Sequence, residues 1–361
     1  MNNVRENQTM KRFKSIIVAA FVVLAAAAYL VPAQPVEAQS SASLSIVPKK
    51  NYTIEPGKNI KDTLTIRNLD NEAPLELSLR VIDFTFSDDG GTPKLMLAED
   101  APQTTWSLKP FLTLPQNVVI PASGTKTINM SVAIPANQGA GSYYSAIVYS
   151  AGSTEGGNVG LSASGVTLVF TSIPGQVKED LSLKKFGAYF EATQGKKTGY
   201  AFVTADKPWA IAYTLENKGN VTESPVGTIT LKHMFGKEQT ISDVNPNKSL
   251  ALIGQTRTFT ACIKLKVEAV AFGQGTSQSS ACAEPTLWPG RYSLALDVFY
   301  GQNGNNTQEI TKTGSFWYLP WWFVIAFLVL LAVIAFFVWR IVRAIRGRIY
   351  GARYRRSSRR R

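Results

Sequence analysis

Two cysteines and one histidine are the rarest side chains in this sequence that could do chemistry. Cys262 and Cys282 lie 20 residues apart, in a part of the chain that the terminal segments described below place outside the cell, where disulfides persist. Closing a loop of this length stabilises a domain by about 3 kcal/mol in the chain-entropy account. The alternative is two unpaired buried thiols, because a metal site would lack a second histidine and any C-x-x-C spacing. The sequence favours a Cys262–Cys282 disulfide.

The sequence contains no recognisable catalytic constellation. His233 is the only histidine, and no G-x-S-x-G nucleophile elbow accompanies it. Asp88 and Asp89 are adjacent, so their side chains point apart, and a glycosidase pair would have to come from distant segments. A phosphate-binding loop, a dinucleotide fingerprint and a D-x-D-x-D-G calcium loop are all absent. We expect a protein that is not an enzyme and that needs no cofactor and no metal.

Two tryptophans are candidate partner-binding residues. Trp106 and Trp288 each lie near prolines in segments without strand periodicity, as ring-stacking tryptophans often do. The alternative is that both rings fill the core or a corner of a β-sandwich.

The N-terminus predicts a secretory signal peptide over residues 1–38. Lys11, Arg12 and Lys14 precede an apolar run over residues 16–31, and a small-x-small site follows. Cleavage between Ala38 and Gln39 is expected, and an uncleaved anchor is the alternative.

The C-terminus predicts a transmembrane helix over residues 316–339, an uncharged run of 24 residues. Trp321 and Trp322 near one end and Trp339 at the other form the aromatic belt of a span. Residues 340–361 contain ten arginines and no acid, beginning with Arg340 and Arg343. Arginines flanking a span favour the cytoplasm, so we expect a single-pass membrane protein with a cytoplasmic tail and most of the chain outside.

The charge of the external part excludes one class of partner. The whole chain has a formal charge of +13, but the excess lies in the two segments that flank the apolar runs. The remaining 24 basic and 24 acidic residues balance. We therefore expect no nucleic-acid partner.

The external part is β-structure by its periodicity. Apolar and polar residues alternate over short runs separated by Gly, Pro and Asn, which is typical of strands that cover a shared core. The clearest runs are residues 75–81, 128–134, 228–232 and 292–298. The length allows two domains, which we place at residues 39–176 and 177–315.

An internal duplication supports two copies of one module. Asn68 and Asn217 each end a predicted strand, and Tyr143 and Tyr292 each begin one; both pairs are 149 residues apart. The copies differ by insertions. The second carries a Gly/Ser-rich loop between its cysteines, and the first an extra stretch over residues 83–115 that contains a predicted hairpin. Insertions in loops of a rigid scaffold often carry recognition.

The chain resembles the WxL-interacting protein family of Gram-positive bacterial surfaces. The resemblance rests on Ser45-Ile46-Val47-Pro48, Pro56-Gly57 before the strand that ends at Asn68, Trp106-Ser107-Leu108 and Val119-Ile120-Pro121. It implies two tandem Ig-like β-sandwich domains, the first binding peptidoglycan and the second another protein, and a C-terminal transmembrane anchor. The stapled insertion and the arginine-rich tail depart from the family pattern.

The sequence therefore predicts an all-β, membrane-anchored surface protein that acts as a non-enzymatic adaptor for cell-wall glycan, a secreted surface protein, or both. One alternative is a membrane-tethered, periplasmic-type assembly chaperone that acts by β-strand addition. A less favoured one is a cell-wall hydrolase built from distant carboxylates. The partner, the binding edge or loop and the oligomeric state stay open.

Overall fold

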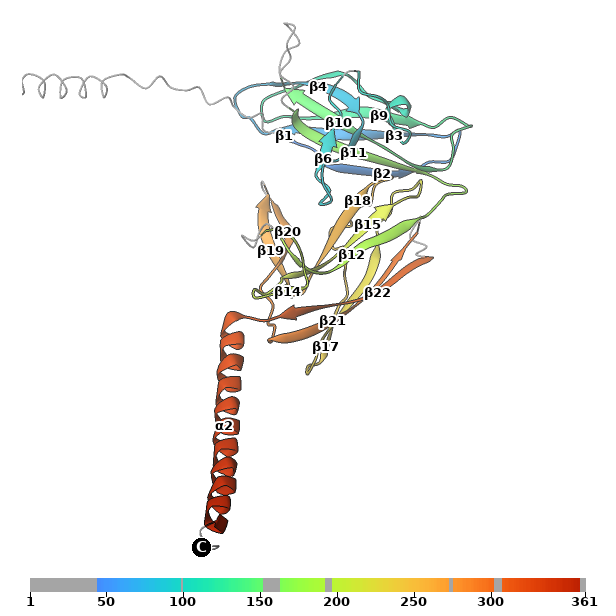
Figure 1. Cartoon of the computed structure of the whole chain (residues 1–361). Coiled ribbons are helices and arrows are strands. Elements are labelled where there is room, and N and C mark those ends of the chain that lie inside the picture. Colours follow the sequence, from blue (N-terminus) through green and yellow to red (C-terminus); the bar gives the residue numbers. More distant parts are fainter. Residues whose placement is uncertain are drawn as a thin grey trace, which may run out of the picture. The chain divides into compact units, whose positions relative to one another are not determined.

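The computed structural model contains two β-sandwiches followed by one helix, α2 (Trp321–Ser357) (Figure 1). It describes residues 44–98, 100–151, 163–191, 197–272, 275–301 and 307–357. The predicted signal peptide and its cleavage site at Ala38 and Gln39 lie outside the described residues.

The first sandwich packs a four-stranded sheet on a five-stranded sheet. The four-stranded sheet has the order β1 (Leu44–Ser45), β3 (Asn59–Asn68), β9 (Thr125–Ala133), β7 (Leu112–Thr113). The five-stranded sheet has the order β2 (Lys49–Thr53), β11 (Ala163–Ile173), β10 (Gly141–Ala151), β4 (Leu75–Ile82), β8 (Asn117–Ile120). All pairs are antiparallel except β2 with β11.

The second sandwich repeats this plan. Its four-stranded sheet has the order β13 (Gly199–Ala201), β12 (Leu181–Phe190), β15 (Ala210–Asn217), β18 (Thr256–Cys262). Its five-stranded sheet has the order β14 (Val203–Thr204), β22 (Gln308–Tyr318), β21 (Gly290–Tyr300), β16 (Val226–His233), β17 (Glu238–Ile241). Here too the first strand of the larger sheet runs parallel to the last, β14 to β22. The predicted all-β class with two Ig-like sandwiches and one C-terminal helix is confirmed.

The predicted alternation becomes alternating burial. In β21, Tyr292, Leu294, Leu296 and Val298 are buried, and Ser293 and Ala295 between them are exposed. Since successive side chains of a strand point to opposite faces, one face fills the core of the second sandwich and the other faces solvent.

Asn68 and Asn217 do the same structural task in the two copies. Each is buried at the end of its strand, and its side-chain amide donates to main-chain carbonyls, of Ala73 and Pro121 for Asn68 and of Val221 and Ala251 for Asn217. Each side-chain carbonyl accepts the N–H two residues on. The predicted duplication is confirmed at these positions, because one buried side chain satisfies both a turn and the neighbouring loop.

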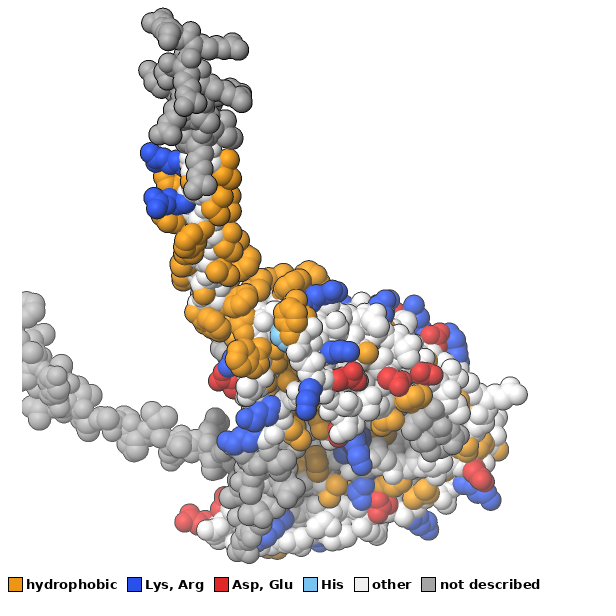
Figure 2. All heavy atoms as spheres, turned by 90° about the horizontal axis from the view of Figure 1, so that it is seen from below, with side chains coloured by type: hydrophobic (Ala, Val, Ile, Leu, Met, Phe, Trp, Pro, Cys, Tyr) orange, Lys and Arg blue, Asp and Glu red, His pale blue; other side chains and the backbone are white. Residues whose placement is uncertain are grey.

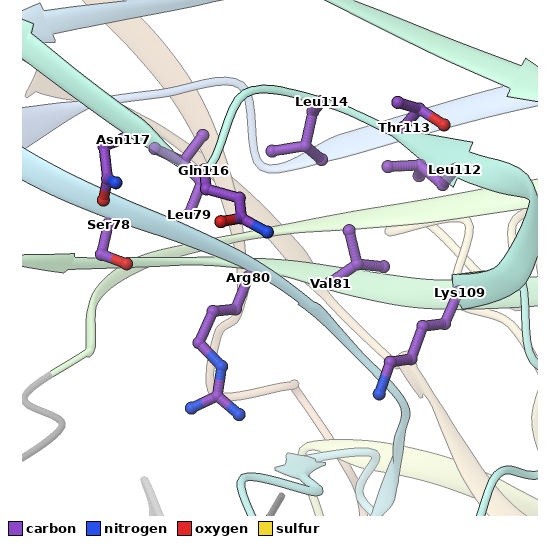
Figure 3. A pocket seen from close by; sticks show the side chains of 10 residues that line it. All are labelled: Ser78, Leu79, Arg80, Val81, Lys109, Leu112, Thr113, Leu114, Gln116 and Asn117. Atoms are coloured by element: carbon purple, nitrogen blue, oxygen red, sulfur yellow. The ribbon is translucent and has the colours of Figure 1, made fainter.

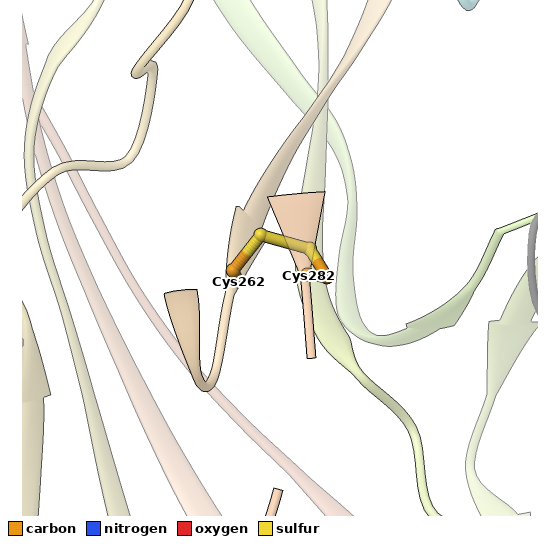
Figure 4. The surroundings of a disulfide bond; sticks show 2 residues. All are labelled: Cys262 and Cys282. Carbon is orange, nitrogen blue, oxygen red and sulfur yellow. A yellow bond between two sulfur atoms is a disulfide. The ribbon is translucent and has the colours of Figure 1, made fainter. Parts of the chain in front are cut away.

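The predicted disulfide is present, with Cα atoms of Cys262 and Cys282 5.0 Å apart (Figure 4). The segment it closes is a hairpin of β19 (Leu265–Phe272) and β20 (Gly275–Cys282), so the expected Gly/Ser-rich loop was wrong. Strand β20 is polar and has no alternating apolar residues, so the sequence did not predict its pairing with β19. The other predicted hairpin is confirmed as β5 (Phe84–Phe86) paired with β6 (Pro93–Leu95).

The span begins later than predicted. Residues 316–318 belong to β22, where Phe316 is buried and stacks on Tyr292, so the predicted start at residue 316 was wrong. From Trp321 to Arg346 the helix is long and apolar enough to cross a membrane. Trp321, Trp322 and Trp339 are exposed on it, and the guanidinium of Arg343 lies 5.3 Å from the Trp339 ring. Arg340 is also exposed, and the helix continues through the arginine-rich segment to Ser357.

Candidate functional site

One edge of the first sandwich is only half covered. Strand β8 pairs with β4 from Leu75 to Ser78, but β4 runs on to Ile82. The Leu79 N–H donates to the Gln116 carbonyl at 2.6 Å, and beyond it no described strand pairs with β4 on this side. On its other side β4 stays paired with β10 as far as Ile82.

The open part of β4 presents main-chain hydrogen-bonding groups. In a strand the N–H and C=O groups of alternate residues point to the same side. Since the Leu79 N–H points towards Gln116, the N–H and C=O of Val81 point to the open edge. Val81 also lines a groove of the first sandwich, so these groups border accessible space.

The shape of this edge is set by Asp83, the first residue after β4. Its buried carboxylate accepts hydrogen bonds from the hydroxyl of Ser107 at 2.6 Å, the hydroxyl of Ser145 at 3.0 Å and the N–H of Thr104 at 3.0 Å. These bonds join the start of the long connection over residues 83–116 to its return and to β10. These hydrogen bonds compensate the cost of burying the polar side chain of Asp83. They also fix the place where the connection returns to the sheet.

The returning chain takes over the pairing that β4 gives up. Ser107 forms a parallel bridge with Tyr144 of β10, and the Leu108 N–H donates to the Ser145 hydroxyl at 3.0 Å. The 3₁₀ helix η1 (Lys109–Phe111) follows, with Leu108 fully buried at its start. Strand β7 then joins the other sheet. This route places Lys109 beside the open edge of β4.

The resulting groove has a volume of about 610 Å³ and is bordered by β4, η1 and the crossing from β7 to β8. Figure 3 shows the side chains of Arg80 and Lys109 extending to the same side of the ribbon. No acid lines the groove, and neither cation forms an ion pair within the described part of the chain. Its lining residues are Ser78, Leu79, Arg80, Val81, Lys109, Leu112, Thr113, Leu114, Gln116 and Asn117.

This set of groups is suited to binding an extended chain. The open Val81 edge offers strand pairing, Arg80 and Lys109 offer charge-assisted hydrogen bonds to carboxylates, and Leu112 and Leu114 offer apolar contact. The lining contains no carboxylate, histidine or cysteine that could act as a base, nucleophile or metal ligand. Among the described residues, no group of three or more His, Cys, Asp and Glu side chains gathers elsewhere.

The tryptophans singled out from the sequence lie in different surroundings. Trp106 is half-buried and stacks on Tyr144 with ring centroids 6.0 Å apart, in a cluster with Phe84. Its indole N–H has no acceptor among the described residues. Trp288 is exposed just before β21. The structure does not bring the two together, and partner binding by either ring stays a prediction.

His233 has a structural role at the end of β16. Its Nε2 lies 3.2 Å from the Pro289 carbonyl oxygen, and its ring lies against Tyr292 with centroids 4.8 Å apart. These contacts tie the β16–β17 turn to the start of β21.

Sequence reasoning missed the residues of the groove. Arg80 is one of the polar positions in the alternating run over residues 75–81, where it looks like any solvated side chain. Lys109 and Gln116 lie in or just after the extra stretch over residues 83–115, and that stretch was the available signal. What could not be foreseen is that it leaves β4 uncovered beside two cations.

Comparisons with known proteins show distant likeness in architecture. No protein-family model matches the sequence, and no curated protein matches it. Among solved structures, the class 5 fimbriae chaperone CfaA has a TM-score of 0.34 at 11% identity and covers 75% of this chain and 98% of its own. The Escherichia coli chaperone DraB has a TM-score of 0.30 at 13% identity, covering 67% of this chain and 99% of its own.

A chain of the Salmonella enterica SafA pilin–SafB chaperone complex has a TM-score of 0.31 at 8% identity, covering 76% of this chain and 97% of its own. At these TM-scores the likeness carries no argument about what this protein binds.

Proposed function

We propose that this protein is a membrane-anchored, non-enzymatic binding protein of the extracytoplasmic space. It takes an extended segment of a secreted protein onto the open edge of β4, as an assembly chaperone acting by strand addition would. The observation that supports this most directly is the unpaired edge at Val81 beside Arg80 and Lys109. The sequence resemblance led us to expect a peptidoglycan adaptor. None of the described residues of the groove favours peptidoglycan binding over strand addition.

The orientation follows from charge. Segment 321–346 of α2 can span a membrane, and arginines at one end of a span favour the cytoplasmic side. The second sandwich ends just before the other end of the span, at Tyr318. Both sandwiches then lie in the extracytoplasmic space. There the first sandwich can bind a segment of a secreted protein before that protein is assembled.

The size of the edge sets the strength of binding. The open part of β4 offers only a few main-chain groups, each contributing about 1 kcal/mol net. Charge-assisted bonds from Arg80 and Lys109, which are partly exposed to solvent, add about 0.7 kcal/mol each. Such a site holds a chain weakly unless the segment carries a carboxylate near Arg80 and apolar side chains over Leu112 and Leu114. The proposed ligand is therefore an extended segment with an acidic side chain or a free C-terminus.

Photo-crosslinking in intact cells tests this directly. Full-length protein is made with p-benzoyl-phenylalanine in place of Asn117, which lies at the end of β8 beside the groove. The matched control carries it in place of Glu238, the exposed first residue of β17 at the corresponding edge of the second sandwich. We expect adducts with secreted polypeptides at position 117 and few at 238, with the crosslinked residues mapping to an extended segment.

Two outcomes would contradict the proposal. Equal yields at both positions would mean that the open edge is not special. Adducts at position 117 with glycan-linked stem peptides, together with pelleting of the external part on purified peptidoglycan, would favour the wall adaptor.

A further inference from the structure

The end of the second sandwich that leads into α2 bears the most exposed apolar side chains outside the helix. Phe235 is 86% exposed, Trp288 71% and Phe202 65%, and Val203 and Met234 are also more than half exposed. The other exposed apolar side chains of the sandwiches are single aliphatic residues, of the kind found on any protein surface.

The strand register brings these residues to one end of the five-stranded sheet. Gly290 at the start of β21 pairs with Tyr318 at the end of β22, and the Trp317 N–H donates to the Phe202 carbonyl at 2.8 Å. His233 at the end of β16 pairs with Tyr292, so the turn that carries Met234 and Phe235 lies at the same end. Segments from three places in the sequence thus present exposed apolar side chains at the same end of the sheet.

This end is held firmly by hydrogen bonds. The Tyr292 hydroxyl accepts the Trp288 N–H at 2.8 Å and donates to the Trp288 carbonyl at 3.0 Å. The Met234 N–H donates to the Arg291 carbonyl at 3.0 Å. The exposed rings therefore lie on main-chain segments that are fixed by hydrogen bonds.

The chain leaves this same end to enter the helix. Only Leu319 and Pro320 separate β22 from α2, and the Leu319 N–H is bonded to the Thr204 carbonyl at 2.8 Å. A two-residue link spans at most about 10 Å between its flanking residues. Since the first turn of a span lies at the membrane surface, the end of the sheet lies there too.

Cations surround the apolar side chains. Lys232, Lys237 and Arg291 are exposed at this end, and none forms an ion pair in the part of the chain that the structure describes. Acids lie at this end too: Glu238 is opposite Lys232, Asp206 follows two residues after Thr204, and Glu284 pairs with Lys207 at 2.7 Å. Figure 2 shows hydrophobic side chains gathered around the start of the helix, with Lys and Arg as well as Asp and Glu side chains beside them.

We infer that this end of the second sandwich is a lipid-docking surface. Phe202, Phe235 and Trp288 insert at the headgroup level of the outer leaflet, where aromatic rings are favoured, and the three cations contact anionic headgroups. The second sandwich is then seated on the bilayer instead of swinging on its link. This goes beyond the proposed function and would hold whatever the groove of the first sandwich binds.

Fluorescence quenching by nitroxide-labelled lipids tests the inference in the full-length protein. The protein is reconstituted in phosphatidylcholine vesicles with and without phosphatidylglycerol, and a bimane label is attached to Phe235→Cys. The control label is at Glu309→Cys, an exposed position of β22 near the opposite end of the sheet. We expect quenching by shallow nitroxides to be at least about threefold stronger at 235 than at 309.

A second pair of variants tests the role of charge. With phosphatidylglycerol present, Lys232→Gln combined with Arg291→Gln should weaken quenching at 235, whereas Lys312→Gln on the middle of β22 should not. Equal quenching at 235 and 309 would overturn the inference. The inference would also be overturned if the label at 235 became shielded from quenchers as the protein density in the vesicles rises, whatever the lipid. A second copy of the protein would then cover this end of the sandwich.

Discussion

The two sandwiches share the order of their five-stranded sheets and differ at one edge of them. In the second, β16 is followed after a short turn by β17, which pairs with it from Ile229 to Lys232. In the first, the corresponding strand β4 is followed by a long connection, and β8 pairs only with Leu75–Ser78. Each edge strand thus covers half of its neighbour, and the part left open differs: it is residues 226–228 at the start of β16 and residues 80–82 at the end of β4, next to the long connection.

The two also differ in how each treats a buried acid. Asp83 of the first sandwich accepts several hydrogen bonds and organises the connection that shapes the groove. Glu223 of the second is also buried, but in the part of the chain that the structure describes its side chain accepts one hydrogen bond, from the Gly301 N–H at 3.2 Å. The comparison can be tested at both places.

Proline substitution should show the largest difference. Ile229 has strand partners on both sides, Ile241 and Leu296, so Ile229→Pro should lower the free energy of unfolding by more than about 3 kcal/mol. Val81→Pro removes an N–H that points to the open edge and should cost about 1 kcal/mol of packing while abolishing crosslinking at 117. Urea denaturation measures both. Equal losses would mean that the Val81 N–H is already bonded.

The duplicated asparagines should behave alike. Asn68→Ala and Asn217→Ala each leave buried carbonyls without a donor and should each cost about 2–3 kcal/mol. Thermal unfolding of the external part measures the loss, and Asn71→Ala at an exposed turn position serves as the control. If the two losses of unfolding free energy differ by more than about 1 kcal/mol, Asn68 and Asn217 are equivalent in geometry but not in their contribution to stability.

Glu223 should make the second sandwich sensitive to pH. Burial, and then the charge of Glu179, raise the pKa of Glu223 from 4.5 to about 7. The folded state then binds a proton that the unfolded state has released between these two values, so its stability falls as the pH rises through this window. The total loss is about 3 kcal/mol, levelling off above pH 7.

Urea midpoints between about pH 5 and pH 8 measure this change. The Glu223→Gln variant should lose the slope over this range. If the variant and the parent protein keep parallel pH profiles, the buried carboxyl is ionised in the folded state and the prediction is wrong.

The groove cations should give the smallest effect. Arg80→Gln combined with Lys109→Gln should leave stability within about 0.5 kcal/mol and reduce crosslinking at 117 about tenfold, equivalent to about 1.4 kcal/mol of binding. Arg67→Gln, on an exposed position of β3, is the matched control. Equal effects of both changes would point to non-specific charge attraction.

Much of the fold could be predicted because strand periodicity is local. In the runs over residues 75–81 and 292–298 the alternation of apolar and polar residues directly predicts which side chains are buried. Asn68 and Asn217 mark equivalent turns. The start of the span was misplaced because Phe316, Trp317 and Tyr318 are apolar whether they enter lipid or a sandwich core. The β19–β20 hairpin was missed because β20 is polar and rich in Gly and Ser, so that the segment resembles a loop although β19 before it alternates.

The candidate site could be predicted only in outline. The extra stretch over residues 83–115 pointed to the part of the first sandwich where the groove lies, since insertions show where a module departs from its copy, but it named no edge. Arg80 and Lys109 could not be paired from sequence, because their proximity depends on the bonds that Asp83 makes to Ser107 and Ser145. Such long-range routing is not written in any local pattern.

The short link between β22 and α2 has a mechanical consequence. If the first sandwich holds a cargo and α2 spans the membrane, as proposed, tension between the two enters the second sandwich at Tyr318, at the end of a strand paired with β21 over its whole length. Because β14 runs parallel to β22, a pull on the C-terminal end of β22 against the N-terminal end of β14 loads the bonds between them in shear, so that they break together instead of one by one. This strand arrangement therefore favours resistance of the second sandwich to mechanical unfolding.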